Sequence, residues 1–165
     1  MENKKESMKT TCINLFKKRG VELSDITEIV YFLQQKYIPD LTMDVCAEAV
    51  DRVLSKREVH YAILTGVELD MLAEQKKLSE PLQSLINSDN PLYGIDEILV
   101  LSICNIYGSI GLTNFGYVDK VKPGIIGILD KLGKNDHVCH TFMDDIIGAI
   151  AAAAASSVAH NSAVE

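Results

Sequence analysis

The segment from His140 to His160 constrains the fold of this chain more than any other. Alanine fills every position from Ala149 to Ala155 except Ile150, a composition typical of a helix. Because these side chains are small, neighbouring backbones can approach such a helix closely. The uncharged run Ile146 to Ala159 would span about 21 Å as a helix, less than the roughly 30 Å core of a bilayer. The segment therefore predicts a central packing helix and no transmembrane span.

Apolar residues in the first half recur at the three- and four-residue spacing of amphipathic helices. One stripe comprises Ile26, Ile29, Val30, Leu33 and Tyr37. Ser24 and Asp25 can cap this helix, and Thr42 can cap the next. A further helix is expected from about Arg57 to Lys77, although Gly66 lies inside it.

A loop from Asn87 to Pro91 divides the chain into an amphipathic half, residues 1–86, and an apolar half, residues 92–160. Within the second half, Gly94 to Tyr107 is apolar almost all round and predicts a buried helix. We therefore predict an all-α fold. Residues 1–165 are expected to form one compact helical domain in which about five helices surround the small-residue helix.

Composition restricts the partners and the compartment. The net charge is −7, and no long basic run is present. This argues against nucleic acid or an anionic membrane surface as the main partner, since both require clustered lysine and arginine. The four cysteines form no CxxC pair, and no secretory signal precedes them. We expect reduced thiols and a cytoplasmic protein.

Two adjacent acid pairs lie in apolar surroundings, Asp96 with Glu97 and Asp144 with Asp145. The stretch Leu78 to Asp119 contains no lysine or arginine that could compensate the first pair. Buried carboxylates require protonation, basic partners or a cation, and hard cations such as Mg²⁺ prefer oxygen ligands. Alternatively, each pair caps the first turn of a helix. Neighbouring helical residues point about 100° apart, so each pair is expected to place one carboxylate inward and one at a rim.

A third cluster contains Asp119 and Lys122, which can share a helix face. His140, four residues before Asp144, is a candidate ligand, proton donor or helix-start residue. Four other helix acids are expected to be solvated rather than ligands: Glu68, Asp70, Asp44 and Glu48.

The three clusters, in this order, resemble the phosphatidylglycerophosphatase A family, which carries a WDE-like pair, an FRxxDxxKPxP segment and a DDxxAG segment. The matching stretches here are Ile95 to Glu97, Phe115 to Pro123 and Asp144 to Ala149. The charged, helical N-terminal half resembles the soluble branch described as low-temperature-requirement C or YutG-like proteins, and this resemblance implies an all-helical fold with a central helix.

This chain also departs from the family pattern. The arginine after phenylalanine is Gly116, which removes a bidentate phosphate donor. The second proline of KPxP is Ile125, and Gly148 and Ala149 stand in exchanged order.

The resemblance implies a Mg²⁺-dependent phosphatase, with Mn²⁺ as an alternative ion, acting on a phosphate monoester such as phosphatidylglycerophosphate. Asp96, Glu97, Asp144 and Asp145 would hold the metal, Lys122 and Asp119 would bind the phosphate, and Asp145, Asp96 and Lys122 would act in catalysis. His140 is a candidate for protonating the leaving oxygen, although the family motif does not include it.

Two alternatives stay open. The lack of membrane spans and the negative charge favour a soluble phosphate ester as substrate, with at most peripheral contact with the inner face of the membrane. The change to Gly116 favours a helical interaction protein that retains the fold without catalysis. We also expect a homo-oligomer, because amphipathic helices and a small-residue helix can serve self-association.

Overall fold

The computed structural model describes residues 7–135 and 137–162, and these residues form helices and no strand. The helices are α1 (Met8–Lys18), α2 (Leu23–Gln34), α3 (Met43–Val53), α4 (Arg57–Glu74), α5 (Leu82–Asn87), α6 (Ile95–Cys104), the 3₁₀ turn η1 (Asn105–Tyr107), α7 (Ser109–Val121), α8 (Ile125–Leu132) and α9 (Met143–Ser162). The all-α prediction is confirmed. Among the described helices, none is long and apolar enough to cross a membrane.

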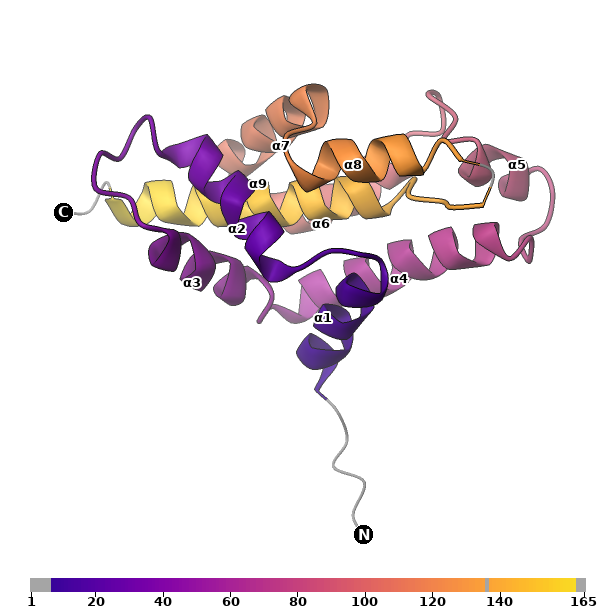
Figure 1. The fold of residues 1–165 in the computed structure, drawn as a ribbon, viewed down its shortest axis with the longest axis horizontal. Helices are drawn as coiled ribbons and strands as arrows, with labels where there is room; N and C mark the ends of the chain where they lie inside the picture. Colours follow the sequence, from indigo (N-terminus) through magenta and orange to yellow (C-terminus); the bar gives the residue numbers. More distant parts are fainter. Residues whose placement is uncertain (1–6, 136, 163–165) are drawn as a thin grey trace, which may run out of the picture.

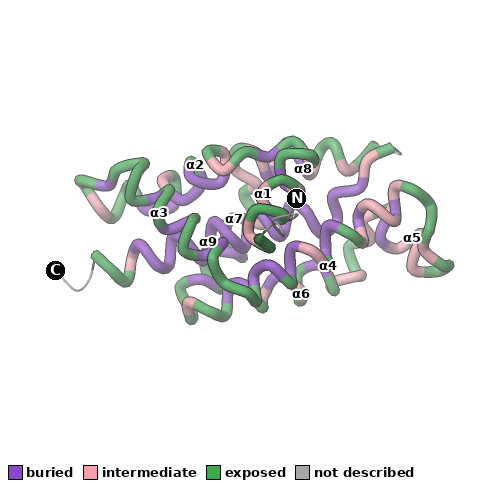
Figure 2. The backbone as a smooth tube through the Cα atoms, turned by 90° about the horizontal axis from the view of Figure 1, so that it is seen from below, coloured by how far each residue is buried: buried purple, intermediate pink, exposed green. Residues whose placement is uncertain are grey.

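Helix α9 is the centre of the molecule, as its alanine content predicted. Figure 1 shows it along the long axis, with α7 and α8 on one side and α3 and α4 on the other. Six helices pack against it, namely α2, α3, α4, α6, α7 and α8. Every residue from Met143 to Val158 is buried, and the tube of α9 is accordingly purple over most of its length in Figure 2. The first turn of α9 is therefore enclosed by other helices.

Of three local predictions, one is confirmed and two need correction. Thr42 caps α3 as expected, since its hydroxyl accepts from the amide of Val45. Ser24 does not cap α2, because the helix begins earlier: Glu22 is the N-cap and forms a capping box with Asp25. Helix α6 is not buried all round either, since Ile98 is 63% exposed.

Gly66 lies in the middle of α4, where that helix meets α6 and α9. A Cβ atom at this position would lie 2.7 Å from Cδ1 of Ile146 and 3.1 Å from Cβ of Phe142. The glycine thus permits a close approach of helices, although it weakens the helix that contains it.

Replacing Gly66 with alanine is expected to lower the free energy of unfolding by about 1–2 kcal/mol, because the cost of overpacking exceeds the gain in helix propensity. Gly148 on α9 is the matched control, since a Cβ there meets its nearest neighbour, Val118, at 3.5 Å. Gly148→Ala should leave stability unchanged or raise it by up to about 1 kcal/mol. Urea unfolding of both variants tests this, and equal stabilities would contradict the packing role of Gly66.

Candidate active site

Both acid pairs line one cavity of about 380 Å³. Its walls come from the α5–α6 loop and from the ends of α6, α7, α8 and α9. The lining residues are Asp89, Asn90, Pro91, Gly94, Asp96, Glu97, Asp119, Lys122, Asp130, Lys134, Asp144 and Asp145. The structure therefore brings together all the predicted site residues except His140.

The two acid pairs differ in burial. Asp96 is buried and Glu97 is exposed, as expected for neighbours on a helix. Asp144 and Asp145 are both buried, contrary to the expectation of one inward and one rim carboxylate. The reason is the central position of α9, which packs against six other helices, so both side chains are largely covered although they line the cavity.

Lys122 is the inner cation of the cavity. It follows α7 in a left-handed backbone conformation, with φ of 51°. Its ammonium group donates to Oδ1 of Asp119 at 2.7 Å and to Oδ2 of Asp144 at 3.0 Å. Burial alone would lower the pKa of Lys122, but Asp144 and Asp119 raise it, so the side chain stays charged. Lys122 thus connects Asp119, its neighbour on α7, with Asp144 of the second acid pair.

The carboxylates outnumber the cations that could balance them. Burial and the adjacent charge of Asp144 raise the pKa of Asp145. Burial also raises the pKa of Asp144 and Asp96, although Lys122 opposes the shift at Asp144. The cavity holds seven acidic side chains, and Lys122 and Lys134 are its two lysines. Asp96, Asp144 and Asp145 are buried, and an excess of negative charge around them favours the binding of protons or of a cation.

One carboxylate oxygen has no partner. Oδ1 of Asp96 is buried and accepts no hydrogen bond from any residue in the described part of the chain. Asp96 lines the cavity, and a carboxylate oxygen without a hydrogen-bond donor can serve as a ligand of a cation. However, no three histidine, cysteine, aspartate or glutamate side chains of residues 7–135 and 137–162 are already grouped closely enough to hold a metal ion.

His140 lies outside the cavity lining, in a separate buried network. Its Nδ1 accepts from the guanidinium of Arg19 at 3.2 Å, and the same guanidinium donates to Glu74 at 2.7 Å. Because arginine can only donate, we assign the imidazole proton to Nε2. Burial and the charge of Arg19 lower the pKa of His140 to about 4, so its ring is neutral at pH 7. The geometry therefore gives His140 no place beside a substrate in this cavity.

Asp70 is a buried residue whose role the sequence analysis missed. It was expected to be solvated, but its side chain is fully buried. It accepts hydrogen bonds from the amides of Phe142 and Met143 at 2.9–3.1 Å. Asp70 lies in the apolar stripe of α4, three residues after Val67 and three before Ala73, and this spacing could have revealed it. Asp70 thus fixes the start of α9, next to the second acid pair.

Three further charged residues of the cavity were not predicted as site residues: Asp89, Asp130 and Lys134. They lie in the α5–α6 loop, in α8 and just after α8, segments without a recognisable motif. Gly116, which replaces the family arginine, is exposed on α7 and does not line the cavity.

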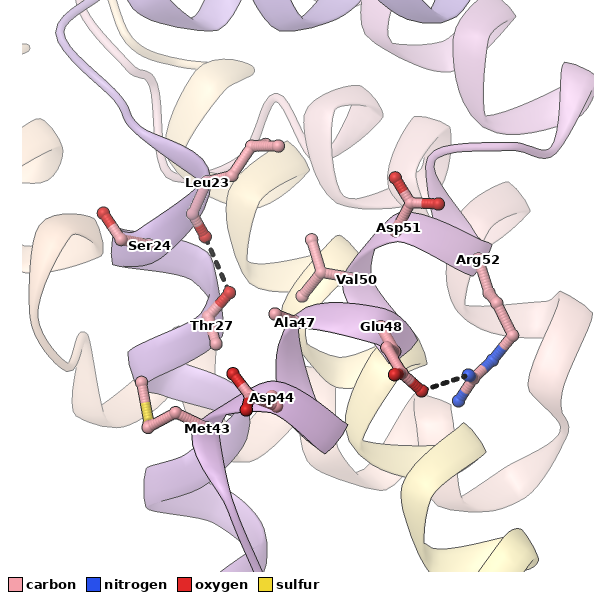
Figure 3. A pocket seen from close by; sticks show the side chains of 10 residues that line it. All are labelled: Leu23, Ser24, Thr27, Met43, Asp44, Ala47, Glu48, Val50, Asp51 and Arg52. Atoms are coloured by element: carbon pink, nitrogen blue, oxygen red, sulfur yellow. Dashed lines mark hydrogen bonds and ion pairs between the residues drawn. The ribbon is translucent and has the colours of Figure 1, made fainter.

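A larger hollow of about 750 Å³ lies between α2 and α3, shown in Figure 3. Leu23, Met43, Ala47 and Val50 contribute apolar surface to it, and Glu48 pairs with Arg52 at 3.9 Å beside them. None of the predicted site residues lines this groove. We therefore assign the candidate site to the smaller, acidic cavity.

Known proteins share the sequence and the fold of this chain. Residues 13–160 match the family model described as phosphatidylglycerophosphatase A. The uncharacterised protein YutG of Bacillus subtilis is 65% identical over 87% of this chain and 86% of its own length. The uncharacterised protein YpjQ of the same organism is 58% identical over 89% of this chain and 81% of its own. The crystal structure of low temperature requirement C protein from Listeria monocytogenes aligns with a TM-score of 0.92 and 53% identity, covering 97% of this chain and 99% of that one.

Proposed function

The chain belongs to the phosphatidylglycerophosphatase A family, and we propose that its acidic cavity is the active site of a divalent-cation-dependent phosphatase that hydrolyses a phosphate monoester. The observation that carries this proposal is the convergence of both acid pairs on one cavity around Lys122, a half-buried lysine. Phosphatidylglycerophosphate is the first substrate to test, because the family bears its name. A soluble phosphate ester is the second.

The donor set fits Mg²⁺ or Mn²⁺ by charge and by ligand chemistry. Carboxylate oxygens are preferred ligands of these ions, and Oδ1 of Asp96 accepts no hydrogen bond from the described residues. We propose Asp96, Glu97, Asp144 and Asp145 as the residues that hold the ion directly or through water. When bound, the ion would neutralise charge on phosphoryl oxygens.

The chain's own residues supply the remaining functions. Lys122 would hold the phosphate, since its ammonium group faces the cavity with Asp144 and Asp119 fixing its position. One buried carboxylate, which we propose to be Asp145 in its ionised form, would orient the attacking water, accept its proton and pass a proton to the leaving oxygen, so that the products are an alcohol and phosphate. The fixed ammonium group would favour the transition state because it requires no reorganisation as charge develops.

A thermal melt in chelator, Mg²⁺ or Mn²⁺, at pH 5.5 and pH 8, tests cation binding. If the folded chain binds the ion, the Tm should rise by roughly 5–10 °C when the ion exceeds its Kd about 100-fold. The rise should be larger at pH 8, because protons compete for carboxylates whose pKa burial has raised. In chelator, where no ion is bound, the Tm should instead fall as the pH rises from 5.5 to 8. A carboxyl group whose pKa is raised in the folded state stabilises that state less and less as the pH increases.

Asp96→Asn should lose the rise in Tm, whereas Glu68→Gln, a change at an exposed acid of α4, should retain it. If neither ion raises the Tm of the parent protein, the carboxylates act only as helix caps. That result would favour the alternative of an interaction protein without catalysis.

A further inference from the structure

The cavity contains two lysines with different environments, and this difference suggests different tasks. Lys122 is the inner one: its side chain is 28% exposed, and its ammonium group already contacts Asp119 and Asp144. Two of its three N–H donors are therefore committed to carboxylates. Lys122 keeps one N–H donor for the phosphate and is held in place by the other two, so it has little freedom to follow an incoming ligand.

Lys134 lies at the mouth of the same cavity, two residues beyond the end of α8. Its side chain is 67% exposed and pairs at 2.8 Å with Asp130, four residues earlier, whose side chain is 21% exposed. Exposed ion pairs of this type contribute little stability and are readily exchanged for a better partner. A phosphate with two negative charges is such a partner.

The position that carries arginine in the related motif cannot supply this contact here. Gly116 has no side chain, and no atom lies within 4 Å of where its Cβ would be. It is also not part of the cavity wall. Within the described lining, Lys134 is thus the one cation other than Lys122.

Resting on the phosphatase function proposed above, we infer that Lys134 is a substrate-binding residue that leaves Asp130 and binds the phosphate monoester at the mouth of the cavity. The lysine retains its charge and changes only its partner, so no covalent step is involved. An interaction made equally with the bound substrate and with the transition state changes KM and leaves kcat unaltered.

Kinetics of Lys134→Gln with 4-nitrophenyl phosphate, in saturating Mg²⁺, test the inference. We expect KM to rise about tenfold, as for loss of one charge-assisted hydrogen bond, with kcat within about twofold. Lys134→Arg should restore most of the affinity. Lys131→Gln is the matched control, because Lys131 is an exposed residue of α8 that does not line the cavity, and its replacement changes the net charge equally. An unchanged KM in Lys134→Gln, or the same rise in Lys131→Gln, would overturn the inference and leave the phosphatase proposal standing.

If the parent protein hydrolyses no phosphate ester, the proposed function fails, and calorimetry with inorganic phosphate then decides the role of Lys134. A roughly tenfold weaker phosphate affinity in Lys134→Gln alone would support an anion-binding lysine. Equal affinities, or no phosphate binding by the parent, would overturn it.

Discussion

Replacing Asp145 with asparagine is expected to reduce Mg²⁺-stimulated phosphate release by at least about 100-fold, while the protein stays folded. Asp145 lies in the buried first turn of α9 and faces the cavity that also contains Asp144 and Asp96. Asparagine has nearly the same shape but lacks the negative charge that would hold a cation or accept a proton from water. Because burial and Asp144 raise the pKa of Asp145, removing its charge should not destabilise the cation-free protein.

Phosphate release should be measured in two assays, one with phosphatidylglycerophosphate in mixed micelles and one with a soluble ester. The comparison shows whether the substrate is a lipid or a soluble phosphate ester. Asp44→Asn is the matched control: Asp44 also lies in the first turn of a helix, α3, but it is exposed and outside the acidic cavity. It should retain full activity. Full activity in Asp145→Asn would refute the site assignment, and an Asp145→Asn protein that fails to fold would show that the carboxylate is needed for stability instead.

The features that the sequence predicted correctly are those set by local pattern. The alanine run placed α9 at the centre because a helix of small residues can pack on all sides. The acids of the two pairs could be grouped because, together with the Asp119 cluster, they follow the order of the motifs of the phosphatidylglycerophosphatase A family. Neither inference required knowledge of how distant helices are placed.

The features that were missed depend on such placement. Lys134 looks like any surface lysine until the end of α8 is placed beside the first turn of α9. His140 looked like a site residue because it precedes Asp144 by one helical turn, yet it turns toward Arg19, a residue more than a hundred positions away. Spacing along one helix cannot distinguish the cavity side from the opposite side when both are buried.

The largest loss of stability is expected from a residue outside the cavity. Asp70→Asn should lower the free energy of unfolding by about 1–3 kcal/mol, because one of the two side-chain oxygens that face the buried amides of Phe142 and Met143 would become an NH₂ group. Burial raises the pKa of Asp70 to about 8, so the loss comes from the missing acceptor and not from a missing charge. The asparagine amide can offer one oxygen, and its NH₂ group would face the amides of Phe142 and Met143 or the Cys139 thiol, which already contacts Asp70 at 3.5 Å. Urea unfolding measures the effect.

Glu68→Gln is the control, since Glu68 lies on the same helix but is exposed, and its replacement should change stability by less than about 0.5 kcal/mol. The affinity of the cavity for Mg²⁺ provides a second measurement. If Asp70 fixes the first turn of α9, the folded Asp70→Asn protein should also bind Mg²⁺ more weakly than the parent, because Asp144 and Asp145 belong to that turn. A variant as stable as the parent would show that other contacts, such as those of Arg19 with the segment before α9, suffice to hold the helix start in place.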